Sequence, residues 1–176
     1  MTNKKKKILF FTSRIPYPLE KGDKLRAYYQ IKYLSNNCDI VLCCMSEEVL
    51  TEKAKEELSR YVSNIHVYKT SKISIILNML IAGIMGYPFQ VGYFFNTGAH
   101  FFFNKIIKKE KPDHIFVQLI RMAEYVTKNK TIPKSLDYMD TFSKGIERRM
   151  EKASGIKKMI FRFEFERLKR YEKKVF

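Results

Sequence analysis

The sequence predicts an α/β domain in which a parallel β-sheet is flanked by helices. Short apolar and β-branched runs, as central parallel strands require, occur at residues 8–12, 38–45 and 114–119. Segments with apolar residues at helical spacing lie between these runs. The chain has 176 residues, of which 45% are hydrophobic, and this is enough for one ordinary domain with a real core.

The loop after the first predicted strand is the strongest local signal of a binding site. Pro16 and Pro18 end the strand and stiffen the loop. Gly22 stands where the loop turns into a helix, and Asp23 follows as an N-cap or first-turn residue. Such a loop, at the carboxyl end of a first strand, is where open α/β sheets bind anionic ligands. A stiff connector without a ligand is the alternative interpretation.

The alternation of strands and helices continues along the chain. Further strands are predicted at 64–69 and 135–140, and helices at 46–62, 97–111, 121–128 and 161–175. Ser46 is the expected N-cap of the helix over 46–62. Phe101 is expected to point inward from the helix over 97–111. Glu164 and Glu172 are expected to pair with Lys and Arg along their own helix.

The most apolar stretch lies at residues 73–85 and has two possible roles. It is shorter than the roughly 20 apolar residues that span a bilayer, and Asn78 and Gly83 interrupt it. It is predicted either to face the core or to dip into a membrane surface with help from Lys69 and Lys72. Residues 86–96 are expected to form a turn followed by aromatic side chains that close the core or stack on a ligand.

Charge and cysteine content restrict the class of protein. The formal net charge of +16 favours anionic partners, although lysines on every solvated face are the alternative explanation. No zinc-finger, RNA-recognition or helix-turn-helix signature occurs, so nucleic acid is not the expected partner. No G-x-G-x-x-G follows the first strand, which argues against a dinucleotide-binding oxidoreductase. The three cysteines lack metal-ligand spacing and indicate buried thiols in a reducing compartment.

Residues 13–34, SRIPYPLEKGDKLRAYYQIKYL, resemble the opening of a subgroup of bacterial family 4 glycosyltransferases with the two-domain GT-B fold. The matching positions are Pro16, Tyr17, Pro18, Lys21, Gly22, Asp23, Lys24 and Arg26. Residues 86–96 and the last helix are also similar to this subgroup, and the resemblance covers nearly the whole chain.

The resemblance implies that residues 1–176 form a single Rossmann-like domain, the N-terminal, acceptor-side half of a GT-B enzyme without its C-terminal nucleotide-sugar-binding domain. The complete enzyme would transfer a sugar from a nucleotide-sugar donor to a cell-surface glycan or a lipid-linked acceptor, with retention of configuration. It would need no metal and no cofactor besides the donor, and this half alone would be inactive. Residues 4–7 precede an apolar run too short for a signal peptide, so a cytoplasmic location is expected, with peripheral attachment to the inner face of the membrane as a possibility. A non-catalytic basic module that binds an anionic membrane or a partner glycosyltransferase subunit is the alternative.

The candidate site residues lie at the ends of the predicted strands and in the loop around Gly22. The resemblance implies that Gly22 and Asp23 frame the inter-domain cleft, with Lys24 and Arg26 near phosphate. Several related enzymes carry a histidine at the turn where this chain has Gln118 and Arg121. Asp137 and Asp140 either contact the acceptor or form caps and salt bridges. The complete set of expected substrate- and phosphate-binding residues is Tyr17, Gly22, Asp23, Lys24, Arg26, Gln118, Arg121, Asp137 and Asp140, and no catalytic residue is assigned.

Overall fold

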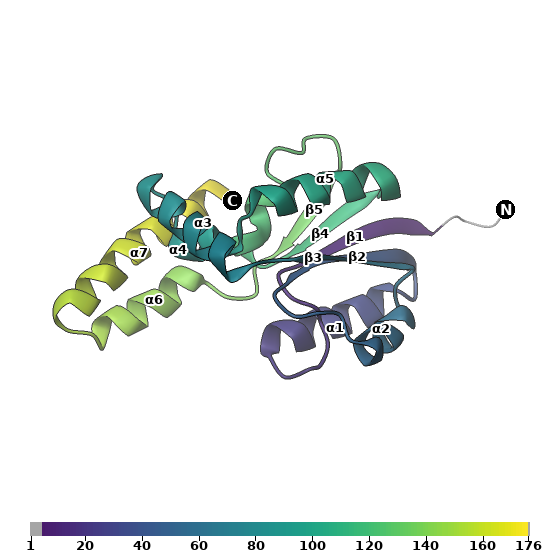
Figure 1. Ribbon diagram of the computed structural model, residues 1–176, viewed down its shortest axis with the longest axis horizontal. Helices are drawn as coiled ribbons and strands as arrows, with labels where there is room; N and C mark the ends of the chain where they lie inside the picture. Colours follow the sequence, from purple (N-terminus) through teal and green to yellow (C-terminus); the bar gives the residue numbers. More distant parts are fainter. Residues whose placement is uncertain (1–4, 176) are drawn as a thin grey trace.

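A computed structural model describes residues 5–175, and these form the predicted α/β domain (Figure 1). Lys4 and Phe176 lie outside the described residues. Within that range the strands make one five-stranded, all-parallel sheet in the order β3-β2-β1-β4-β5. The strands are β1 (Lys6–Thr12), β2 (Cys38–Ser46), β3 (Asn64–Lys69), β4 (His114–Gln118) and β5 (Lys134–Asp137).

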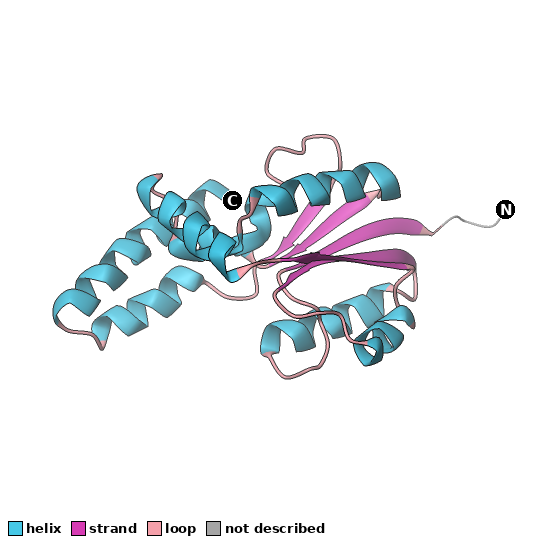
Figure 2. Cartoon of the chain, in the orientation of Figure 1, coloured by secondary structure: helices cyan, strands magenta, loops and turns pink. Residues whose placement is uncertain are grey.

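Helices cover both faces of the sheet and gather beyond the carboxyl ends of its strands (Figure 2). The elements are α1 (Gly22–Leu34), α2 (Glu52–Ser59), α3 (Lys72–Ile84), α4 (Phe89–Phe94), α5 (Thr97–Glu110), the 3₁₀-helix η1 (Ile120–Tyr125), α6 (Phe142–Glu151) and α7 (Gly155–Val175). α1 and α2 lie on one face and α5 on the other, while α3, α4, α6 and α7 form a separate group (Figure 1).

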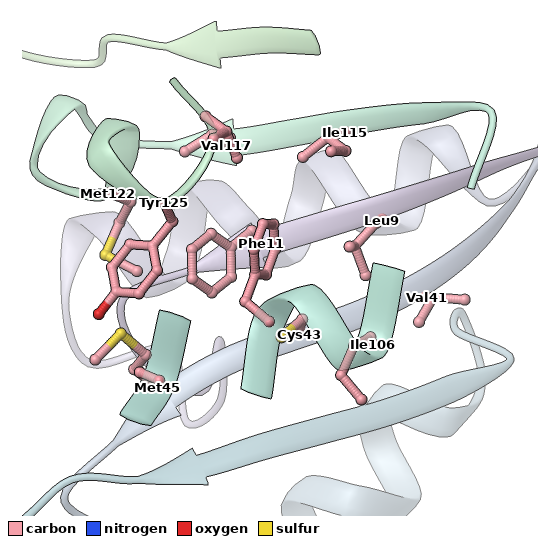
Figure 3. Packing of buried hydrophobic residues seen from close by; sticks show 13 residues of the cluster. Leu9, Phe11, Val41, Cys43, Met45, Ile106, Ile115, Val117, Met122 and Tyr125 are labelled. Atoms are coloured by element: carbon pink, nitrogen blue, oxygen red, sulfur yellow. The ribbon is translucent and has the colours of Figure 1, made fainter. Parts of the chain in front are cut away.

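The central strand β1 is buried on both faces, which explains its uninterrupted apolar sequence. Leu9 and Phe11 face α5, and the Phe11 ring lies 5.1 Å from the ring of Tyr125 in an edge-on contact (Figure 3). Phe10 points to the opposite face, where it packs in the cluster that contains Ile31 of α1 and Leu58 of α2. The period-two alternation of β1 therefore supplies both halves of the core.

Several element boundaries differ from the prediction. Ser46 is the last residue of β2 rather than a helix cap, and Thr51 caps α2 by accepting from the N–H of Ala54. Ser46 remains in the sheet because β2 pairs with β3 as far as Lys69. β5 ends at Asp137, earlier than predicted.

The region after β3 also contains differences. The segment predicted as a turn before residue 97 contains a short helix, α4. The helix expected at 121–128 is the 3₁₀ turn η1. Phe101 was expected to point inward but is 70% exposed, and Phe103 occupies the core position instead. The ring of Phe103 stacks on the ring of Phe11 of β1, with 4.3 Å between their centroids, so this contact determines which side of α5 faces the sheet.

The charged side chains of α7 hold the ends of three other helices. Glu164 accepts from the first two N–H groups of α4 at 2.9 and 3.3 Å. Arg167 donates to the carbonyl of Gly83 at the end of α3 at 2.7 Å. Glu172 accepts from the N–H and hydroxyl of Ser143 in α6 at 3.0 and 2.5 Å. Within α7 the charge of Arg167 acts on Glu164, as expected for an i,i+3 pair, but the hydrogen bonds of Glu164 and Glu172 go to groups at the starts of other helices.

Candidate functional site

The strand order creates a crevice between the carboxyl ends of β1 and β4. The chain leaves β1 toward α1 on one face of the sheet and leaves β4 toward η1, which packs with α5 on the other face. The connections therefore diverge between these two neighbouring strands. In open α/β sheets such a topological switch point is where ligands bind.

A cluster of charged side chains lies at this crevice. Arg121 donates from Nη2 to Oδ2 of Asp23 at 3.1 Å and to the hydroxyl of Ser13 at 2.9 Å. Arg14 donates to the same oxygen of Asp23. The side chain of Gln118 donates to the main-chain carbonyl of Asp23 at 2.8 Å. Three of the predicted site residues, Asp23, Gln118 and Arg121, thus come together with two that were not predicted.

The cluster has an excess of positive charge. Two guanidiniums share one carboxylate, and Arg121 is only 11% exposed. The Arg121 guanidinium lies over the ring of Phe94 at 4.1 Å from its centroid. Its Nε has no hydrogen-bond partner among residues 5–175. A buried donor without a partner costs free energy, so the cluster favours an additional anionic acceptor.

Both burial and neighbouring charges shift the pKa values of Asp23 and Arg121. Burial alone would raise the pKa of Asp23, but the guanidiniums of Arg14 and Arg121 outweigh it and hold that pKa below its usual value. Burial, together with the Arg14 charge, lowers the pKa of Arg121 to about 10 against the opposing effect of Asp23. Asp23 and Arg121 are therefore ionised at neutral pH, and Asp23 is not suited to act as a general base.

A polar cavity of about 420 Å³ opens on one side of the cluster. Lys24 is buried in its wall, with Nζ 3.8 Å from Glu48. The lining contains four cations, from Lys24, Arg14, Lys21 and Lys72, and two carboxylates, from Glu47 and Glu48. Its size falls in the range of small-molecule sites. Lys24 is therefore placed to meet an anionic group that enters this cavity.

A second cavity, of about 440 Å³, lies beside α3, α4 and α6. It combines basic residues, including Arg121 and Arg149, with an apolar wall. Arg14, Tyr93 and Phe94 line both cavities. The apolar wall consists of Met79, Phe89, Phe142 and Ile146. We call the charged group formed by Ser13, Arg14, Asp23, Gln118 and Arg121 the Arg14–Arg121 cluster. This cluster lies between a polar cavity and a more apolar one.

A separate cluster of predicted residues links α1 to β5. Arg26 donates twice to the carboxylate of Asp137, at 2.7 and 3.0 Å, and Gln30 donates to it at 2.7 Å. Asp137 thus forms a salt bridge, one of the two roles considered for it. Asp140 is exposed, and its charge acts on Arg26.

Tyr17 and Gly22 lie near the crevice without joining its charged cluster. Tyr17 is half-buried and packs against the core beneath α1. Gly22 is the first residue of α1, and a Cβ there would lie 3.9 Å from the side chain of Met139. Among residues 5–175, no three His, Cys, Asp or Glu side chains come together as metal ligands would.

The prediction missed Arg14 as a part of this site. Arg14 stands two residues after the end of β1, at the same sheet edge as Asp23, and its position in the sequence is a signal that could have identified it. Tyr93 and Phe94 belong to the aromatic segment expected either to close the core or to stack on a ligand; they line both cavities from α4, and Tyr93 donates from its hydroxyl to Glu47 at 2.8 Å. Their place at the site depends on the packing of α4 against α3, which no local pattern reveals.

The chain was also compared with known proteins. No protein-family model matches it, and no curated protein matches it.

Proposed function

We propose that this domain is the acceptor-binding half of a retaining glycosyltransferase, which transfers a sugar from a nucleotide-sugar donor to a glycan or lipid-linked acceptor. The observation that supports this proposal most directly is the pair of guanidiniums, Arg14 and Arg121, that share Asp23 at the switch-point crevice. Guanidiniums recognise phosphate oxygens with several directed hydrogen bonds. The transfer reaction releases a diphosphate, and lipid-linked acceptors carry one.

In this proposal each side chain at the crevice has its own role in binding. Arg121 and Arg14 bind phosphate oxygens, and Asp23 holds both guanidiniums in the crevice. Gln118 fixes the start of α1 through its bond to the Asp23 carbonyl. Lys24 contributes charge in the polar cavity. Because catalysis requires donor and acceptor to be fixed together, we expect this domain alone to transfer no sugar.

A binding experiment tests the proposal. The chain is titrated by calorimetry with inorganic pyrophosphate, glucose 1-phosphate and a short-chain prenyl diphosphate-linked glucose. The Arg121→Ala variant should bind the sugar-diphosphate probe at least about tenfold more weakly, because a charge-assisted hydrogen bond is lost. The Arg121→Lys variant should recover part of this affinity. Arg60→Ala, which removes an exposed arginine just after the end of α2, is the control and should bind as the wild type does.

A thermal melt of each variant shows whether it is folded, so that weak binding is not a result of unfolding. Affinity that is the same in folded Arg121→Ala and in wild type would contradict the phosphate role. No binding of any of the three probes to the wild type would contradict the acceptor-binding proposal itself.

The proposal includes a location in the cytoplasm, at the inner face of the cell membrane. Its support is the net charge of +16, since anionic lipids of that leaflet attract basic proteins. Among residues 5–175, no helix has both the length and the apolar character that crossing a membrane requires. A non-catalytic basic module that binds the membrane or a partner glycosyltransferase subunit is the second candidate, and vesicle binding without binding of any sugar-phosphate probe would favour it.

A further inference from the structure

α3 exposes most of its apolar side chains to solvent. It buries only Ile75 and Ala82 in the part of the chain that the structure describes, whereas Ile84 is 88% exposed. The exposed side chains follow helical spacing, so they form one continuous stripe. They are Ile73, Ile76, Leu77, Leu80, Ile81, Ile84 and Met85. The stripe that was predicted either to face the core or to meet a membrane therefore points outward.

The first half of α7 carries a second exposed apolar stripe. Its members, at spacing i, i+3, i+4 and i+7, are Ile156, Met159, Ile160 and Phe163. Arg167 connects this stripe to the end of α3, because its guanidinium lies 3.9 Å from the ring centroid of Phe163 and donates to the carbonyl of Gly83. We call the two stripes together the α3–α7 face. Monomeric soluble proteins rarely expose so many large apolar side chains on adjacent elements.

The charges on the α3–α7 face have one sign. α3 and residues 155–163 contain Lys72, Lys157, Lys158 and Arg162 and no carboxylate side chain. A second copy of this chain on the face would bring these cations together, and the repulsion would oppose association. Anionic phospholipid offers both an apolar layer and opposite charge.

We propose that the α3–α7 face docks the domain on an anionic bilayer, with α3 lying in the plane of the interface. This inference rests on the membrane location in the proposed function and assigns the surface responsible for it. α3 has 13 residues and is therefore about 20 Å long, too short to cross a bilayer but suited to lie along one. Met79 of α3 lines the second cavity from the side of the helix that also holds Ile75 and Ala82, so docking through the exposed stripe places that cavity across α3 from the lipid.

Vesicle co-sedimentation tests the docking surface. Wild-type protein should bind vesicles containing phosphatidylglycerol and bind pure phosphatidylcholine much more weakly, and added salt should weaken the binding. The double variant Ile76→Glu/Leu80→Glu should bind anionic vesicles at least about tenfold more weakly, because two large apolar contacts are lost and two like charges are added. Ile160→Glu should weaken binding as well, since it alters the α7 stripe.

A matched control is available on α5. Phe101 is a large apolar residue, 70% exposed, on α5, which covers one face of the sheet and carries neither stripe (Figure 1). Phe101→Glu adds the same charge and should change vesicle binding less than about twofold. All of these side chains are exposed, so each variant should retain the far-UV circular dichroism and melting temperature of the wild type.

Three outcomes would overturn the inference. The first is equal vesicle binding by Ile76→Glu/Leu80→Glu and Phe101→Glu. The second is equal binding to neutral and anionic vesicles. The third is a lipid-free dimer, seen by light scattering, that Ile76→Glu/Leu80→Glu dissociates. Arg121→Ala should keep full vesicle binding while losing the sugar-phosphate probe, so failure of the docking surface and failure of the acceptor site give different results.

Discussion

Arg26 and Asp137 are 111 residues apart in the sequence, and two hydrogen bonds of 2.7 and 3.0 Å join them. The pair attaches α1 to the end of β5, which is the edge strand of the sheet and has four residues. Asp137 is 8% exposed and Arg26 is half exposed. The interaction therefore stabilises the least extensively paired strand of the fold.

Removing Arg26 should destabilise the domain. In Arg26→Ala, Asp137 loses its bidentate partner and keeps Gln30, so we expect the free energy of unfolding to fall by about 1–3 kcal/mol. Urea denaturation measures the change. Lys144→Ala breaks an exposed i,i+3 pair with Glu147 and should cost less than about 1 kcal/mol. Equal losses in the two variants would contradict a special role for Arg26.

The same pair predicts a dependence on pH. Burial alone would raise the pKa of Asp137, but hydrogen bonds from Arg26 and Gln30 outweigh it and lower the pKa below the value of 3.8 for a free carboxyl. A lowered folded-state pKa means that the stabilisation is complete above about pH 4 and disappears as the pH falls through the folded-state pKa. The stability difference between wild type and Arg26→Ala should therefore be constant from pH 7 to pH 5 and shrink in stronger acid.

Glu172 should be essential for the start of α6. In Glu172→Ala, the buried N–H and hydroxyl of Ser143 lose their acceptor, and we expect a loss of about 1–3 kcal/mol in unfolding free energy. Hydrogen exchange should become faster in α6 and remain unchanged in α2. Lys173→Ala alters the exposed neighbouring residue and should leave both helices as they are. Unchanged exchange in α6 of Glu172→Ala would show that this contact is dispensable.

Two glycines should respond in opposite ways to alanine. A Cβ at Gly92 would lie 2.4 Å from Cβ of Ala82, so Gly92→Ala should push α4 away from α3 and cost about 1–3 kcal/mol. A Cβ at Gly145 has no described atom within 4 Å, and Gly145→Ala in α6 should stabilise by about 0.5–1 kcal/mol. Thermal melting of the two variants should show shifts of opposite sign. A stable Gly92→Ala variant would disprove close packing of α3 on α4.

The cysteines should differ in reactivity. Burial raises the pKa of Cys43 well above its usual value and the pKa of Cys44 to about 12, whereas Cys38 is half-buried. Because Cys43 and Cys44 are buried and resist ionisation, a disulfide reagent at pH 8 should react quickly with Cys38 alone. All three thiols should react after unfolding, and Cys38→Ser should remove the fast phase. Fast reaction of a second thiol in the native protein would contradict the burial of β2.

The fold class and part of the site follow from local sequence patterns. Apolar runs identify β1, β2 and β4, and parallel strands place their carboxyl ends at one edge. That rule brings Asp23 near Gln118 and Arg121, and the structure confirms their proximity. This rule about strand ends can be applied without knowing which side chains form pairs.

Other contacts depend on partners that are distant in sequence. Arg26 was predicted to lie near phosphate, yet it pairs with Asp137 across the domain, and no spacing rule relates residues so far apart. The phosphate role of Arg26 remains a prediction. In α3 the periodicity identifies an apolar stripe but not the direction in which it points, because that direction depends on α4, which packs on the side that holds Ala82. From the sequence alone, the charged residues of α7 are expected to pair with one another on the surface. Their contacts with the ends of α3, α4 and α6 become visible only in the folded structure.

The attachment of three helices to α7 has a consequence for the order of folding during synthesis. The strands and helices of the sheet are complete by Asp137, before any residue of α7 emerges from the ribosome. The start of α4 has no acceptor until Glu164 is available, and the end of α3 has no donor until Arg167 is available. The start of α6 likewise depends on Glu172. We therefore expect α3 and α4 to lack these anchors until α7 has emerged, so that the apolar side chains of α3 are accessible to chaperones or membrane lipid before the crevice takes its final shape.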